Sequence, residues 1–368
     1  MTREDGSDKR KINVAVIGLG FGRHFIPLYQ NHPGVDRVAI CDANPELVRE
    51  LGDHNGVEAR FSSLEDVLAS DEFDAVHLLT PVPFHVEQTL AVLKAGKHCA
   101  CAVPMATNLA DLQRIIDASR SANRVYMLME TSAYSREFLY VQDMHARGEF
   151  GPLTFFRGAH IQDLDGDFPL YWHAQPPMHY ISHAISPILA LTKTRATRVV
   201  CFGAGELRPD LQQPGGNTFP LQTALFQLEG TKAVAEVTRS WFQVARSFTE
   251  SFSVYGERKS FEWATLEHDD PVIFTLDEER PKFRRDASFE RVSIPYRPDL
   301  VPPELAPFAD TTHGGSHPHL VHEFVSSILE ARPSSIDAVT AANWTATGIC
   351  ADNSALLNGE PVLIPGFN

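Results

Sequence analysis

Two histidines and a tyrosine lie close together in the stretch Pro176–His183, which reads PPMHYISH. On a helix, side chains four residues apart are about 5–6 Å from each other, so His179 and His183 would share one face beside Tyr180. Three kinds of chemistry fit these rings: a metal site, a hydrogen-bonded core contact, or proton transfer near neutral pH.

Proton transfer is the favoured interpretation. Histidines four residues apart are typical of helical zinc sites, but the Glu of H-E-x-x-H is missing, and we expect no metal. His183 is the first candidate for a catalytic base, with Tyr180 and His179 beside it. Tyr180 needs a lowered pKa for this task, which a neighbouring imidazolium would provide.

The composition favours a small-molecule enzyme. A net charge of -15 repels phosphate backbones and anionic lipids, so we expect no nucleic-acid and no membrane partner. The charged N-terminus lacks an apolar segment and no run approaches the roughly 18 apolar residues of a membrane span, which predicts a cytoplasmic protein. The five cysteines lie in apolar surroundings and are expected to be buried thiols. At 368 residues, the length predicts two domains, or one large domain with a substantial insertion.

The first segment reads as a dinucleotide-binding turn. An apolar run, Ile12–Ile17, leads into GLGFGR and a helical segment that extends to Asn31. The next apolar run, Arg37–Cys41, ends at Asp42, whose carboxylate would accept hydrogen bonds from ribose hydroxyls and repel a 2′-phosphate. NAD is therefore expected, with Arg23 at the third glycine position as a departure that could touch a phosphate. The residues predicted here to bind the cofactor are Gly18, Gly20, Gly22, Arg23 and Asp42.

Alternating strand and helix patterns continue beyond this turn. They predict a doubly wound parallel sheet. The expected helices are Leu64–Leu68, His85–Ala95 and Leu109–Ser119, and the expected strands are Ala75–Leu79, His98–Cys101 and Val125–Met129.

At this point the sequence resembles the Gfo/Idh/MocA family of NAD(P)-dependent sugar and inositol enzymes. The resemblance rests on IGLGFG, TPVPFH, AGKHCACAVPMA and VTAANWTATGICADNSALLNGEPV, which are spread over nearly the whole chain. It implies a Rossmann domain (1–130) and a C-terminal α/β domain (131–368) with a large, open, mainly antiparallel sheet. It also implies that the last helix packs back on the Rossmann domain. It further implies a homo-oligomer, a dimer or tetramer formed through that sheet. The cofactor contacts that it adds are Phe21, Thr80, Pro81, His85 and Pro104.

The chain departs from the family at the proton-transfer positions. Most members carry Glu-Lys-Pro where this sequence has Ala102, Val103 and Pro104, and valine cannot move a proton. The family's Asp-x-x-x-His helix corresponds to the segment with His179 and His183. A Tyr-x-x-His pair without the lysine is similar to the NAD-dependent glycosidases of this fold, which oxidise C3, eliminate the glycoside, add water and reduce again.

Three functions remain open at this stage. The first is a glycoside hydrolase with bound NAD that works through a transient C3 ketone, which would acidify the C2 proton and remove the need for two carboxylates. The second is an ordinary NAD-dependent sugar or polyol dehydrogenase in which His183 replaces the lysine. The third is a non-catalytic, NAD-bound regulatory protein.

The second half supplies candidate substrate contacts. Arg157 and His160 lie on opposite faces of the expected strand Leu153–Ile161. The acidic and aromatic segment Asp163–His173 is typical of a loop that lines a sugar site, and the motif THGGSHPHLVHEF opens a helix. The substrate-binding residues predicted from these segments are Arg157, His160, Tyr171, Trp172, His173 and His317.

Further strands are expected in this half. Segment 269–309 has no clear periodicity and resembles a surface excursion, and Trp241 with Phe242 fits either a subunit interface or core. The expected strands are Arg198–Phe202, Gln222–Leu228, Ala233–Val237, Phe252–Tyr255 and Ser260–Trp263.

Overall fold

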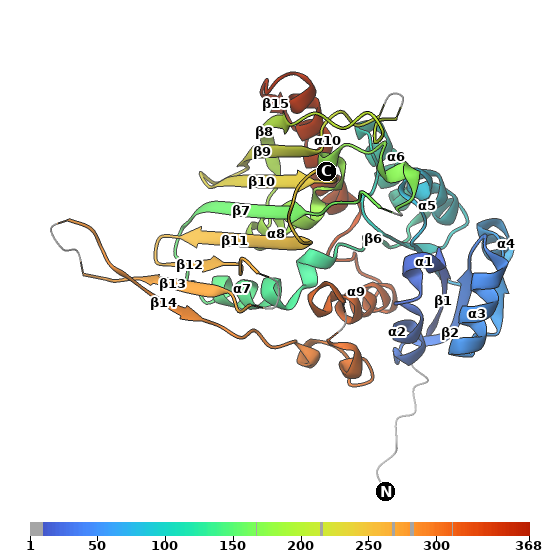
Figure 1. Ribbon diagram of the computed structural model, residues 1–368. Coiled ribbons are helices and arrows are strands. Elements are labelled where there is room, and N and C mark those ends of the chain that lie inside the picture. Colours follow the sequence, from blue (N-terminus) through green and yellow to red (C-terminus); the bar gives the residue numbers. More distant parts are fainter. Residues whose placement is uncertain (1–9, 167, 214–215, 267–268, 280–282, 311) are drawn as a thin grey trace, which may run out of the picture.

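In a computed structural model, residues 10–166, 168–213, 216–266, 269–279, 283–310 and 312–368 are described. They form two sheets flanked by helices, a parallel sheet of six strands and a mixed sheet of nine (Figure 1). The predicted α/β class is therefore confirmed. Most of the charged N-terminus discussed above, residues 1–9, lies outside the described residues. No described helix has both the length and the apolar character that crossing a membrane requires.

The first sheet is the predicted doubly wound sheet, with strand order β3-β2-β1-β4-β5-β6 and all neighbours parallel. Its central strands are buried on both faces because helices cover both, which explains their continuous apolar runs. The strands are β1 (Ile12–Ile17), β2 (Val35–Cys41), β3 (Ala59–Phe61), β4 (Ala75–Leu78), β5 (His98–Cys101) and β6 (Tyr126–Leu128).

The connecting helices begin at polar caps that the sequence supplies. Asn44, Asn108 and Ser135 each accept a hydrogen bond from a backbone N–H of the first helical turn. The helices are α1 (Leu19–Gly22), α2 (Ile26–Asn31), α3 (Pro45–Asn55), α4 (Leu64–Ala69), α5 (His85–Lys94), α6 (Leu109–Ala122) and α7 (Arg136–Ala146), with short 3₁₀ turns η1 (Val82–Phe84) and η2 (Thr131–Tyr134).

The second sheet has the order β14-β13-β12-β11-β7-β10-β9-β8-β15. Only the β7–β10 pair is parallel among the pairs described, so the sheet is mainly antiparallel as expected. Its strands are β7 (Leu153–Ile161), β8 (Ala196–Ala204), β9 (Leu221–Leu228), β10 (Val234–Ser240), β11 (Thr249–Gly256), β12 (Lys259–Glu262), β13 (Val272–Leu276), β14 (Ala287–Arg291) and β15 (Val362–Leu363).

Segment 269–309 corrects the expectation of an unstructured excursion. Its β13 and β14 extend the edge of the second sheet as a long hairpin (Figure 1). Every residue of β14 is exposed, so this strand has no apolar face that could have given a period of two. The 3₁₀ turns η5 (Pro298–Leu300) and η6 (Ala306–Phe308) follow it.

Helix α8 (Ser182–Thr192) lies against the inner face of the second sheet, in contact with β7, β10 and β11. The contact is close because β7 carries Gly158 there: a Cβ on Gly158 would lie 2.0 Å from the carbonyl oxygen of Ala184. The preceding 3₁₀ turns are η3 (Leu170–Trp172) and η4 (Pro177–Tyr180).

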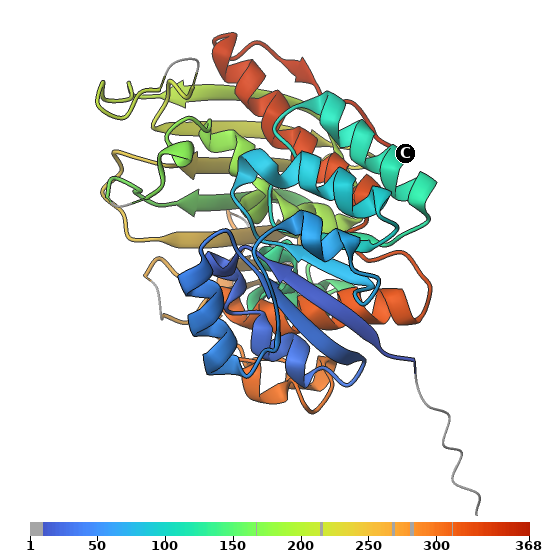
Figure 2. The ribbon, with the colours of Figure 1, turned by 90° about the vertical axis from the view of Figure 1, so that its right-hand side faces the viewer.

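The last two helices connect the two sheets. Helix α10 (Ala338–Leu356) packs against both β8 and α6, and it crosses the upper part of the molecule in Figure 2. Helix α9 (Thr312–Leu329) packs on α2 and η2. Because one apolar cluster includes strands of both sheets, the boundary after residue 130 stays a prediction.

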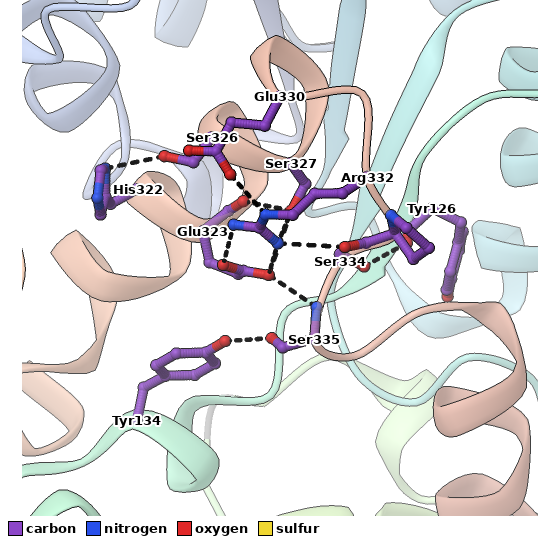
Figure 3. Close-up of polar contacts among 11 residues, drawn as sticks. Tyr126, Tyr134, His322, Glu323, Ser326, Ser327, Glu330, Arg332, Ser334 and Ser335 are labelled. Carbon is purple, nitrogen blue, oxygen red and sulfur yellow. Dashed lines mark hydrogen bonds and ion pairs between the residues drawn. The ribbon is translucent and has the colours of Figure 1, made fainter.

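A polar network holds the turn between α9 and α10 (Figure 3). The guanidinium of Arg332 donates to both carboxylate oxygens of Glu323 at 2.8 and 2.9 Å. Ser334 donates to the carbonyl oxygen of Tyr126 at 2.7 Å, and Ser335 contacts the hydroxyl of Tyr134. The network therefore joins α9 to β6 and η2, directly beside the end of the first sheet.

We expect Gly158→Ala to lower the free energy of unfolding by about 2–3 kcal/mol, because the new Cβ overlaps the backbone of α8. Thermal or urea unfolding measures the change. Gly166→Ala is the matched control, since nothing lies within 4 Å of a Cβ at that position. Equal stability of both variants would contradict the close contact between α8 and β7.

Candidate active site

The stretch Pro176–His183 is not one continuous helix, which corrects the expected geometry. The turn η4 ends at Tyr180 and α8 begins at Ser182. As a result His179 lies 3.5 Å from the Asp352 carboxylate on α10, whereas the ring of Tyr180 lies 5.1 Å from that of His183. The expected trio is thus reduced to the pair Tyr180 and His183.

His183 is held by two carboxylates. Its Nδ1 donates to Glu130 Oε1 at 2.6 Å and lies 3.5 Å from Glu250 Oε1, with the Thr131 hydroxyl at 3.3 Å. Burial alone lowers the pKa of His183, but the charges of Glu130 and Glu250 outweigh it and raise the pKa to about 9. The ring is therefore an imidazolium at neutral pH. This corrects its expected role as a base, because a protonated ring can only donate.

Glu130 follows β6, at the carboxyl edge of the first sheet, and is fully buried. Burial raises the pKa of its carboxyl, yet the charge and hydrogen bond of His183 outweigh burial, and the pKa is lowered. The backbone N–H of Ser132 donates to the same carboxylate oxygen at 3.0 Å. Glu130 is thus an ionised group that orients the imidazole through Nδ1 and leaves Nε2 available to a ligand.

Glu250 and His160 complete the cluster from the neighbouring strands β11 and β7. His160 Nδ1 lies 3.9 Å from Glu250 Oε1, and its ring lies 5.3 Å from that of His183. Burial, followed by the charges of Arg239 and His183, holds the pKa of His160 well below its usual range, so this ring is neutral. His160, His183 and Glu250 have the donor set of a metal site, with ligand atoms within 4.8 Å of one another. That no metal binds here stays a prediction.

Tyr180 does not have the lowered pKa that a base requires. Burial and the charges of Glu250 and Glu130 raise the pKa of its hydroxyl. Its ring lies 5.2 Å from that of Trp172 and 5.4 Å from that of Trp241. Tyr180 is therefore a protonated hydroxyl in an aromatic wall of the cluster, able to donate a hydrogen bond to a ligand.

The glycine turn fits a dinucleotide. Gly18 has φ 89°, and a Cβ there would lie 2.6 Å from the Leu79 carbonyl oxygen, so the fold itself requires glycine. By contrast, a Cβ on Gly20 would meet nothing within 4 Å, which leaves the open space that a pyrophosphate needs. A Cβ on Gly22 would lie 3.0 Å from Val16 Cγ1, so Gly22 takes the close-packing role expected of the third glycine. Arg23 donates to the backbone carbonyl oxygens of Leu19 and Gly20 instead of extending away from the helix.

Asp42 lies beside this turn at the end of β2. Its carboxylate accepts hydrogen bonds from the backbone N–H of Leu19 at 2.7 Å and of Asn44 at 2.9 Å. The side chain is thus fixed where the ribose of a dinucleotide would meet it. Phe21 is partly exposed on the same turn.

His85 supports the cofactor side without a free ring nitrogen. Its Nε2 lies 2.8 Å from the carbonyl oxygen of Thr80 and its Nδ1 lies 2.8 Å from that of Pro104, so it joins the two segments that end β4 and β5. This corrects its expected contact with the cofactor. Thr80 donates to Gln88 at 2.5 Å, Pro81 begins the turn into η1, and the Val103–Pro104 peptide bond is cis.

Some of the predicted substrate residues lie at the cluster, and others lie away from it. His160 and Trp172 lie with Tyr180 at the cluster, and Tyr171 packs on Trp172 at 5.1 Å. Arg157 lies on the opposite face of β7 and pairs with Glu236, so its predicted contact with substrate is wrong. His173 is buried against Phe242. Trp241 and Phe242, which fitted either a subunit interface or core, are buried within this chain.

His317 also corrects an expectation. It is fully buried, with its ring 4.6 Å from that of Phe25 and 5.7 Å from that of Phe21, so it packs under the dinucleotide turn and not at the cluster. His313, from the same motif, lies nearer: its pKa is lowered by burial and also responds to the charges of Glu250 and His183. Its left-handed backbone, φ 55°, places it before the regular part of α9.

The sequence reading missed Glu130, Glu250 and Arg239. Glu130 carried a usable signal, since it directly follows a predicted strand and ligands bind at the carboxyl ends of parallel strands. Arg239 and Glu250 lie just outside the strands predicted at Ala233–Val237 and Phe252–Tyr255, which β10 and β11 extend. Their polar side chains ended the apolar pattern, so the pattern could not include them.

Similar folds occur among solved structures. A levoglucosan dehydrogenase in complex with NADH and levoglucosan superposes with a TM-score of 0.79, at 20% identity, over 97% of this chain and 100% of that one. A scyllo-inositol dehydrogenase from Lactobacillus casei gives a TM-score of 0.72 at 18% identity, covering 96% and 99% of the two chains. At these identities the likeness establishes the fold alone.

Curated relatives and a family model agree with that fold. A glycosyl hydrolase family 109 protein of Saccharopolyspora erythraea is 24% identical over 97% of this chain and 83% of its own length. One of Shewanella baltica is 27% identical over 48% of this chain, which spans only 43% of that protein. Residues 12–130 match the model of an oxidoreductase family with an NAD-binding Rossmann fold. The match to the family model therefore covers the first sheet and ends at Glu130.

Proposed function

We propose that this protein is an NAD-dependent enzyme that cleaves a glycoside through a transient C3 ketone of the sugar. The observation that carries the proposal is the His183 imidazolium held by Glu130 and Glu250, in a chain whose usual lysine position is the buried Val103. The relatives named glycosyl hydrolase family 109 proteins support a hydrolytic outcome.

The chain's own residues would divide the proton transfers. NAD held at the glycine turn would supply the hydride chemistry at C3, while the proton of the C3 hydroxyl would pass to solvent and return when the ketone is reduced again. The C3 ketone acidifies the C2 proton, and Glu250, the partly exposed carboxylate of the cluster, would accept that proton. His183 would donate its proton to the leaving oxygen as the C1–O bond breaks. Water then adds across C1 and C2, so the net reaction is hydrolysis.

A plain sugar or polyol dehydrogenase is the second candidate. The specific observation in its favour is that the fold matches a levoglucosan dehydrogenase and a scyllo-inositol dehydrogenase over their full lengths. In that reaction the carboxylates around His183 would accept the hydroxyl proton, and NADH would be released as a product.

The cofactor assignment predicts different effects for two glycines. Gly20→Ala should weaken NAD binding by about tenfold or more while leaving the melting temperature unchanged, because its Cβ meets no protein atom and would occupy the cofactor's space. Gly18→Ala should reduce both stability and NAD affinity, because its Cβ overlaps the Leu79 carbonyl group. Calorimetric titration with NAD and thermal unfolding separate the two effects. Unchanged NAD affinity in Gly20→Ala would argue against this binding site.

The pH dependence follows from the sign of the His183 shift. The imidazolium persists below about pH 9 and is lost above it, so kcat/KM should fall on the alkaline side with an apparent pKa near 9. Glu130→Gln removes the nearest negative charge and should move this alkaline limb downward by about one unit or more. Glu236→Gln, a substitution on the far face of the sheet, is the control and should leave the profile in place. An alkaline limb that does not move in Glu130→Gln would show that His183 is not the acid.

Deuterium at C2 distinguishes the two candidate reactions. If cleavage proceeds by elimination, sugar released in D2O should carry deuterium at C2, detected by NMR, with no accumulation of NADH at 340 nm. Cleavage without the label would refute the elimination step. Stoichiometric NADH from a free sugar, without cleavage of any glycoside, would support the dehydrogenase.

A further inference from the structure

Arg239 is a buried cation beside the catalytic cluster that the proposed reaction does not use. It lies on β10, paired in register with His160 of β7, and its side chain has no exposed surface. The guanidinium lies 3.7 Å above the ring of Trp241 and 5.8 Å from the ring centre of Tyr180. It therefore belongs to the same inner face of the sheet as His160.

The hydrogen bonds of Arg239 are only partly satisfied. Nη1 donates to the carbonyl oxygens of His160, at 3.0 Å, and of Ser240. Nε and Nη2 are buried and have no partner among the described residues, and the same holds for Nε1 of Trp241. These three atoms are donors only, so only an acceptor can satisfy them.

The charge of Arg239 is only partly compensated: burial lowers the pKa of its guanidinium, and the nearby charge of Glu250 offsets this lowering in part. Within the described parts of the chain, no carboxylate lies within 4 Å of its guanidinium, because Glu130 and Glu250 are directed at His183. A buried charge without a counter-charge is costly, and a ligand that supplies one recovers that cost on binding. Two other arginines of this domain, Arg157 and Arg195, are paired with Glu236 and Glu229.

We propose that Arg239 selects sugars that carry a carboxylate, as in a glycosiduronic acid, and binds that carboxylate through Nε and Nη2. Two parallel N–H donors match the two oxygens of a carboxylate, which a neutral hydroxymethyl group cannot do. The partly exposed rings of Trp172 and Tyr180 pack on Trp241, whose ring lies over the guanidinium. This inference names the substrate class of the proposed function and rests on it.

Binding to the NAD-loaded protein tests the inference without requiring turnover. Titration calorimetry should show that D-glucuronate binds more tightly than D-glucose by at least about tenfold. Arg239→Gln should reduce glucuronate affinity on the order of 10- to 100-fold and change glucose affinity less than about threefold. Arg239→Lys keeps the charge but lacks the two parallel N–H donors, so its glucuronate affinity should lie between that of the wild-type protein and that of Arg239→Gln. Arg147→Gln, at a surface ion pair with Glu149, is the matched control.

Three results would overturn the inference. The first is equal affinity of the wild-type protein for both sugars, and the second is an equal loss of affinity for both in Arg239→Gln. The third is an Arg239→Lys variant that is folded, as thermal unfolding shows, and whose glucuronate affinity is unchanged. Turnover of p-nitrophenyl glucuronides and glucosides distinguishes failure of the carboxylate selectivity from failure of the proposed hydrolysis. Preference for glucuronate without glycoside cleavage would refute the hydrolysis and leave the selectivity. Cleavage of both glycosides at equal kcat/KM would refute the selectivity and leave the hydrolysis.

Discussion

The 2.6 Å hydrogen bond between Glu130 and His183 is the contact on which the site depends. Both groups are buried, and each would be costly to bury as an ion without the other. Glu130 comes from the end of the first sheet and His183 from the helix that covers the second. The same interaction therefore fixes the protonation state of the imidazole and the position of α8 relative to the cofactor side.

Two glycines make that position sterically possible. Gly158 lets α8 approach β7, and Gly348 of α10 lies against η4, where a Cβ would be 2.0 Å from the carbonyl oxygen of Met178. The segment that carries Tyr180 and His183 is thus held from two sides by backbone contacts without side chains between them. Such contacts leave little freedom for the catalytic rings, since interiors at this density deform only at a cost.

The sequence predicted the first sheet well because its strands and helices have strong, regular periods and its turns use glycine with Asp42 at the expected place. It predicted the position of His183 but not its state. An expected helix over Pro176–His183 placed His179 with His183, whereas the chain forms η4 and then α8, and His179 lies 3.5 Å from the Asp352 carboxylate. Arg239 and Glu250 come from β10 and β11, the two strands that flank β7, and pairing between distant strands cannot be deduced from local patterns.

The environments of three neighbouring side chains shift their pKa values in different directions. Carboxylates raise the pKa of His183, burial with positive neighbours lowers that of His160, and burial with negative neighbours raises that of Tyr180. Pushing such values apart is how a protein assigns distinct acid and base roles to adjacent groups. His183 is then the charged donor, His160 a neutral ring and Tyr180 a neutral hydroxyl, which leaves Glu250 as the partly exposed group able to accept a proton.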